Sequence, residues 1–112
     1  MEKKIISGAR LIYVEPKNDG EAGYSYILAF FTDGTCRSFW PSTIERALGQ
    51  KGQLAFRQMM NDNDFLAFAD AEIEYDVVVK DEKEQTIIES IVFNDEFGLL
   101  DILAKKFVAS MI

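Results

Sequence analysis

Acidic and apolar residues alternate strictly along residues 70–76, and this alternation is the most informative pattern in the chain. A period of two is typical of a half-buried β-strand, in which the acids share one face and the apolar residues point into a core. Successive carboxylates on that face are expected roughly 6.5–7 Å apart. The acidic ladder consists of Asp70, Glu72, Glu74 and Asp76.

Four interpretations of the acidic ladder are open from the sequence. Neighbouring carboxylates raise one another's proton affinity, so they could hold Mg²⁺ or act in acid–base catalysis as a small metal-dependent enzyme. A regular row of negative charges could imitate a phosphate backbone and inhibit a nucleic-acid enzyme. The ladder could also dock on a basic protein and accelerate association by steering. The fourth interpretation is a solvated face that keeps an exposed sheet from pairing edge to edge.

The rest of the chain offers no catalytic motif. There is no histidine, which excludes Ser-His-Asp and Cys-His arrangements, and a single cysteine cannot build a thiolate metal cluster. Phosphate-binding and dinucleotide-binding glycine motifs are missing, and Asp62-Asn63-Asp64 lacks the later residues of a calcium loop. We therefore expect no catalytic residue, no cofactor and no metal, and a protein that is not an enzyme.

The charge is distributed unevenly along the chain. The net charge is −7, but residues 62–101 carry thirteen acids against Lys80 and Lys83, a balance of −11. A dominant acidic cluster argues against a nucleic-acid partner and favours a basic protein partner. The predicted docking surface spans residues 62–89. Its expected contact residues are Asp70, Glu72, Glu74, Asp76 and Glu89.

Length and composition indicate one globular domain over residues 1–112. Hydrophobic residues make up 48% of the chain and there are only two prolines, which favours a packed core over disorder. The single cysteine, Cys36, is typical of a reducing compartment. No apolar run approaches the ~20 residues of a membrane span. We expect a cytoplasmic protein with no membrane contact.

The order of elements predicts an α+β domain: an antiparallel sheet of about five strands in the order β-β-β-α-β-β-α, with helices packed on it. Ser42 and Glu45 are spaced as a capping box at the start of the first helical region, residues 42–61. The second helix is expected over residues 95–110. The predicted strands are Ile5–Val14, Tyr24–Thr32, Thr35–Trp40, Asp70–Val79 and Thr86–Phe93.

Asp33-Gly34 is the strongest turn signal, and as a two-residue turn it places Phe31 opposite Cys36. In this register Cys36 is expected to be a buried small hydrophobic residue. The aromatic residues of this hairpin suggest core packing, or alternatively a stacking platform for single-stranded nucleic acid beside Arg37. The aromatic residues concerned are Tyr24, Tyr26, Phe39 and Trp40.

Leu99 and Ile102 lie off the main apolar stripe of the last helix. Apolar side chains in such a position favour a homodimer contact through this helix, although single exposed apolar residues are common on monomers.

Two segments resemble a family of small bacterial proteins of unknown function, often encoded beside toxin–antitoxin-type genes. The hairpin Phe30–Phe39 is similar to the family pattern F-x-D-G-x-x-R-x-F, and Phe56–Phe65 is similar to a later F-x-x-L-x-D-x-x-x-F segment. Trp40-Pro41 stands where the family has Asp-Leu, and residues 84–112 have no counterpart. The resemblance, over residues 5–79, implies no catalytic residues and a partner-binding role. With the acidic ladder it favours an inhibitor, immunity or antitoxin-like protein of a bacterium, phage or mobile element.

Overall fold

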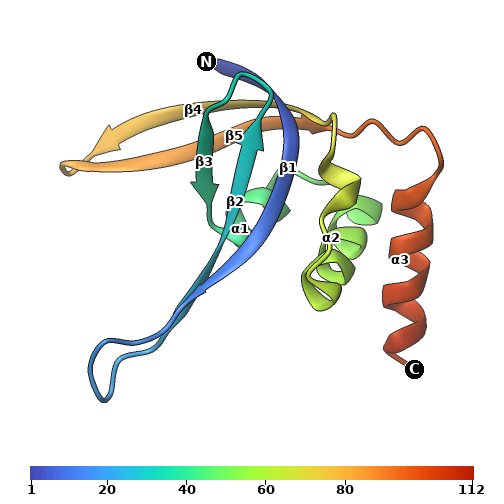
Figure 1. The fold of residues 1–112 in the computed structure, drawn as a ribbon, viewed down its shortest axis with the longest axis horizontal. Coiled ribbons are helices and arrows are strands. Elements are labelled where there is room, and N and C mark those ends of the chain that lie inside the picture. Colours follow the sequence, from blue (N-terminus) through green and yellow to red (C-terminus); the bar gives the residue numbers. More distant parts are fainter.

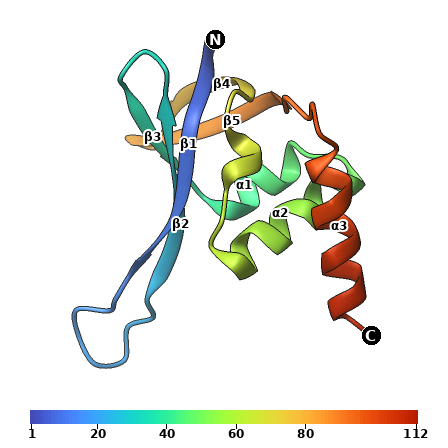
Figure 2. The same ribbon diagram turned by 45° about the vertical axis from the view of Figure 1, so that its right-hand side comes forward.

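One antiparallel sheet of five strands forms the frame of the molecule, with the strand order β3-β2-β1-β4-β5 (Figure 1). The structure is a computed structural model that describes residues 1–112. Its helices lie on the same side of the sheet (Figure 2), so the α+β class expected from the sequence is confirmed. The elements are β1 (Glu2–Val14), β2 (Tyr24–Phe31), β3 (Cys36–Phe39), α1 (Pro41–Arg46), α2 (Gln50–Asp62), the 3₁₀ turn η1 (Leu66–Phe68), β4 (Glu72–Lys80), β5 (Lys83–Val92) and α3 (Leu99–Ser110).

The core lies between the inner face of the sheet and the helices α1 and α2. Phe56 of α2 is fully buried and packs against Phe68 of η1, with ring centroids 6.0 Å apart. On the sheet side, Tyr75 stacks on Phe31 at 6.1 Å and meets Phe39 edge-on at 5.5 Å. Aromatic contacts of this kind join the hairpin, the central sheet and the helices into one cluster.

Two long hairpins extend from this core in different directions and form two arms (Figure 1). The arms diverge because β1 pairs with β4 only over Glu2–Ile5, whereas β1 pairs with β2 as far as Val14 and β4 with β5 as far as Lys80. The β4–β5 arm ends in a two-residue turn, in which Asp81 has a φ of 52° and Glu82 of 64°. Both residues thus adopt the left-handed conformation of a type I′ turn, which normally favours Asn and Gly.

The β2–β3 hairpin differs from the expected register by one residue. Phe30, not Phe31, lies opposite Cys36, because the turn contains three residues: Phe31 N–H donates to Thr35 at 2.8 Å and Gly34 has a φ of 88°. This is a type I turn followed by a glycine bulge. The slip moves Cys36 to the outer face, so the prediction of a buried cysteine was wrong: Cys36 is exposed.

An irregularity at Ser7 changes which residues of β1 face the core. Ile6 lies opposite Phe31 but Gly8 lies opposite Phe30, so Ser7 is an extra residue in the ladder. A bulge shifts the alternation by one residue. Strict alternation along the predicted strand Ile5–Val14 would put Ile5 on the same face as Ala9 and Leu11. Because of the bulge, Ile6 instead joins Ala9 and Leu11 in the core, and Ile5 is exposed on the outer face.

The helix boundaries also differ from expectation. The capping box does not form: Trp40 is the N-cap of α1, and Ser42 caps nothing. Glu45 instead forms an ion pair with Arg57, in which Glu45 Oε1 lies 2.6 Å from Arg57 Nη2, and this pair joins α1 to α2. The last helix begins at Leu99, later than predicted, after Gly98 with a φ of 67°. None of the helices combines the length and apolarity needed to span a membrane.

Candidate interaction surfaces

The outer face of β1, β4 and β5 carries the acidic ladder and has no helix over it. Glu72, Glu74 and Asp76 follow one another along β4, as the alternation predicts. They are partly neutralised by β1. Lys3 Nζ lies 2.8 Å from Glu72 and 3.8 Å from Glu74, and the amino terminus lies 3.2 Å from Asp76. Three carboxylates thus face two cations.

The pKa of Lys3 is raised above its ordinary value of 10.5, first by the hydrogen bond to Glu72 and then by the charges of Glu72 and Glu74. Lys3 therefore stays fully protonated at neutral pH and holds two neighbouring carboxylates together. A basic partner that docks on this face must compete with Lys3 for them.

Two predicted contact residues lie outside the regular ladder. Asp70 precedes β4, with a φ of 65°, and its N–H donates to the carbonyl of Ile6 at 2.7 Å. Glu89 is the extra residue of a bulge in β5, since Ser90 lies opposite Glu74 and Ile88 opposite Tyr75. Both side chains are exposed. The structure thus brings together three of the five predicted residues in one row.

Apolar side chains lie in the same rows as the acids, which the sequence pattern did not predict. Ile5 and Val92 flank Glu72 on the neighbouring strands, and Ile87 lies opposite Asp76. Ile87 is 48% and Val92 61% exposed. We define the open acidic face as Ile5, Glu72, Glu74, Asp76, Ile87 and Val92. Nowhere in the chain do three or more potential metal-ligating side chains converge.

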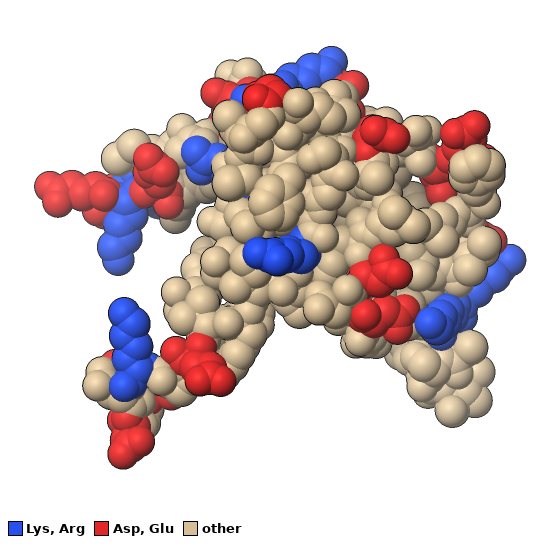
Figure 3. Space-filling model, in the orientation of Figure 1, with Lys and Arg blue, Asp and Glu red and all other residues tan.

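A groove of about 760 Å³ lies between the two arms, and Figure 3 shows the hollow at this place. It brings together the aromatic hairpin residues and Arg37 that the sequence singled out. Tyr24 meets Trp40 edge-on, with ring centroids 5.7 Å apart, and lies 6.4 Å from Tyr26. Tyr24 and Trp40 are 49% and 56% exposed, so these two rings are not core, whereas Phe39 is buried in the core.

Sequence patterns did not indicate the remaining walls of the groove. Arg46 and Thr43 come from α1, and Glu84–Ile87 come from β5. These segments are far apart in the chain, and only the curvature of the sheet brings them to one place. The groove holds two arginines, four aromatic rings, of which those of Tyr24 and Trp40 are exposed, and several hydroxyl groups.

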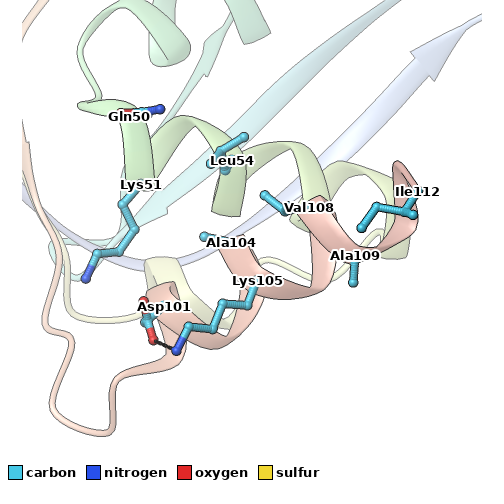
Figure 4. Close-up of a pocket in the computed structure, with 9 residues that line it drawn as sticks. All are labelled: Gln50, Lys51, Leu54, Asp101, Ala104, Lys105, Val108, Ala109 and Ile112. Carbon is cyan, nitrogen blue, oxygen red and sulfur yellow. Dashed lines mark ion pairs between the residues drawn. The ribbon is translucent and has the colours of Figure 1, made fainter.

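A shallow trough of about 520 Å³ runs between α2 and α3. Leu54 of α2 lines the trough together with Ala104 and Val108 of α3, and the ion pair between Asp101 and Lys105, at 2.9 Å, lies at one end (Figure 4). This ion pair lowers the pKa of Asp101. The trough is the space left between two helices that pack on each other.

Leu99 and Ile102, the predicted dimer residues, do not line this trough. Leu99 is half-buried and Ile102 is 58% exposed. A homodimer through these two residues stays a prediction, which concentration-dependent sedimentation would test. Comparison of the chain with protein-family models, curated proteins and solved structures finds no match.

Proposed function

We propose that this protein is a non-enzymatic interaction module that docks the open acidic face on a basic protein partner. The observation that carries the proposal is the row in which exposed Ile5 and Val92 flank Glu72. Such a row offers both apolar area to bury and charge to steer a partner.

The open face of an antiparallel sheet is usually polar, because the other face supplies the core. Here the inner face already packs on the helices, so the exposed Ile87 and Val92 contribute nothing to the core. Exposed apolar groups beside charged ones are typical of protein interfaces, where the apolar centre is buried and the charges direct association. This supports a protein partner rather than a solvated face alone.

The same rows favour a protein partner over phosphate mimicry. Lys3 and the amino terminus interrupt the row of negative charges, and apolar side chains lie between the acids. A phosphate backbone presents an uninterrupted series of charges. A basic protein, by contrast, can replace Lys3 with its own cation and cover the apolar groups at the same time.

The proposed role is that of an inhibitor, immunity or antitoxin-like protein acting in the cytoplasm. The resemblance of residues 5–79 to small bacterial proteins encoded beside toxin–antitoxin-type genes agrees with this role. In such a pair the acidic module would cover a basic surface of its partner.

Affinity capture from the source cell tests the proposal. The wild type is compared with a ladder variant, Glu72→Gln/Glu74→Gln/Asp76→Asn, and with a control variant, Glu15→Gln/Asp19→Asn/Glu21→Gln, which makes the same charge change in the exposed β1–β2 loop. Captured proteins are quantified by mass spectrometry at low and moderate salt, and each is then purified and titrated against all three chains.

We expect a basic protein that binds the wild type and the control variant, and that binds the ladder variant at least tenfold more weakly. Moderate salt should weaken the wild-type complex, because exposed charges are screened. Equal binding to all three chains, or no partner at all, would contradict the proposal.

A further inference from the structure

We propose that the groove between the arms binds an extended, acidic segment of a protein partner, which adds to the sheet as a strand beside β3. This site shares only Ile87 with the open acidic face and uses none of its acids.

The residues that line the groove show that it borders the edges of the sheet rather than a face. Arg37, Ser38 and Phe39 are consecutive in β3, and Glu84–Ile87 are consecutive in β5. Successive side chains of a strand point to opposite faces, so a cavity that touches consecutive residues touches the strand's edge. β3 and β5 are the two edge strands of this sheet. Both free edges therefore border one groove.

The register of the β2–β3 hairpin shows which backbone groups are free. Phe31 N–H donates to the Thr35 carbonyl, so these residues form a hydrogen-bonded pair. In an antiparallel ladder hydrogen-bonded and non-hydrogen-bonded pairs alternate. Arg37 therefore bonds to β2, and Cys36 and Ser38 direct their N–H and C=O groups outward. An extended peptide can pair with these groups, as in recognition by strand addition.

The side chains around this edge define the chemistry of the peptide. Arg37 and Arg46 make no ion pair, although the chain carries a net charge of −7. The guanidinium of Arg37 lies over the ring of Tyr75, 5.5 Å from its centroid, which fixes it at the base of the groove. These two arginines outnumber Glu84, the one acid that lines the groove, and so select a carboxylate. The exposed Tyr24 and Trp40 rings offer an apolar surface to a neighbouring side chain.

A peptide explains the groove better than single-stranded nucleic acid, which would also use arginines and aromatic rings. Both arms flank the groove with tips of net negative charge: residues 15–21 carry three acids and Lys17, and residues 80–84 carry three acids with Lys80 and Lys83. These charges repel a phosphate backbone along its length but tolerate a short segment with one carboxylate. Free strand edges, moreover, are complementary to a peptide backbone and not to bases.

The test is a selection of random eight-residue peptides by phage display on the wild-type chain. Selected peptides without Trp are synthesised and titrated while the fluorescence of Trp40, the only tryptophan, is recorded. Each is also made with N-methyl groups on alternate amides, and an eight-nucleotide oligothymidylate is titrated in parallel. The variants are Ser38→Pro, Ser38→Ala, Arg46→Gln and, as a matched arginine outside the groove, Arg10→Gln.

We expect selected peptides with an acidic residue among alternating β-formers. N-methylation should weaken binding at least tenfold, and so should Ser38→Pro, since proline removes an outward N–H that β2 does not use. Ser38→Ala and Arg10→Gln should bind like the wild type, and Arg46→Gln several-fold more weakly. If Ser38→Pro does not fold, the proposal is tested by the binding of the N-methylated peptides compared with that of the unmethylated ones. No selected peptide, indifference to N-methylation, or tighter binding of the oligonucleotide would overturn the proposal.

Discussion

Lys4 of β1 donates a hydrogen bond to Asp33 in the β2–β3 turn, although 29 residues separate them in the chain. The ammonium group of Lys4 also lies 5.9 Å from the centroid of the Phe31 ring. Asp33 in turn accepts bonds from the backbone N–H of Thr35, at 2.9 Å, and from its hydroxyl group. One carboxylate thus fixes the geometry of the turn and joins it to the first strand.

This arrangement predicts the response of stability to acid. The Lys4 hydrogen bond and then the Thr35 bonds hold the pKa of Asp33 far below its ordinary value of 3.8. The stabilisation is therefore present above that value and is lost as the pH falls toward the lower pKa of the folded state. The free energy of unfolding, measured in urea from pH 2 to 6, should fall less steeply with acid in Asp33→Asn than in the wild type. Equal slopes would contradict this assignment.

At alkaline pH the stability of the protein depends on groups whose pKa is raised, so the stabilisation is lost as the pH rises rather than as it falls. The pKa of Lys4 is raised, mainly by its hydrogen bond to Asp33, and that of Lys3 is raised by Glu72 and Glu74. Their contribution is complete below the ordinary value of 10.5 and is lost as the pH rises through the higher pKa of the folded state. Urea unfolding from pH 8 to 12 should show a smaller loss of stability for Lys4→Met than for the wild type, provided that both spectra remain native at pH 8.

Cys36 provides a direct test of the hairpin register. Because three turn residues place it on the outer face, its thiol should react with Ellman's reagent in the folded protein at nearly the rate seen in urea. The register with a two-residue turn buries Cys36 and predicts a much slower reaction. Protection of the thiol in the monomeric folded protein would therefore show that the register is wrong.

Gly34 is required by the same turn. Its φ of 88° is in the region that residues with a Cβ rarely adopt, and Gly34→Ala should destabilise the protein by about 1–2 kcal/mol. Gly8 is the matched control, because a Cβ added there meets nothing within 4 Å and its φ is ordinary. Gly8→Ala should change the free energy of unfolding by much less. The comparison is made by urea unfolding.

Phe56 is the centre of the core between α2 and η1. It is fully buried, and truncation leaves a cavity, so Phe56→Ala should cost about 3–5 kcal/mol. Phe97 is 86% exposed and serves as the control, because Phe97→Ala removes the same atoms from water rather than from a core. Thermal unfolding should show a large decrease in Tm for the first variant only. Similar decreases would mean that Phe97 is also part of a packed interface.

The fold class could be predicted from the sequence because apolar residues recur with the period of two of a strand, or the period of 3.6 of a helix, along most of the chain. The β4 strand is an example: its alternation placed Ile73 and Tyr75 in the core and Glu72 and Glu74 outside, as the structure has them. Local composition decides this pattern, so no knowledge of distant contacts is needed.

The errors arose where a single extra residue changes the pattern. The bulge at Ser7 exchanged Ile5 for Ile6 in the core, and the third turn residue at Asp33-Gly34 moved Cys36 outward. Both irregularities depend on backbone geometry that the residue types at these positions do not indicate. The groove was beyond sequence reasoning for another reason. Its walls combine Arg37 with Glu84 through the curvature of the sheet, which depends on the short pairing of β1 with β4.

The two unpaired edges of the sheet have a consequence for solubility. Exposed edge strands are templates on which copies of a chain can polymerise, and proteins usually guard them with charge. Here the acids Asp81, Glu82 and Glu84 lie at the start of the edge strand β5, and the overall charge of −7 adds repulsion between molecules. Neutralising these acids, by low pH or by mutation, therefore removes the barrier to strand-by-strand growth. We expect the concentration at which the protein stays monodisperse to fall as the pH is lowered, and light scattering across pH would measure that threshold.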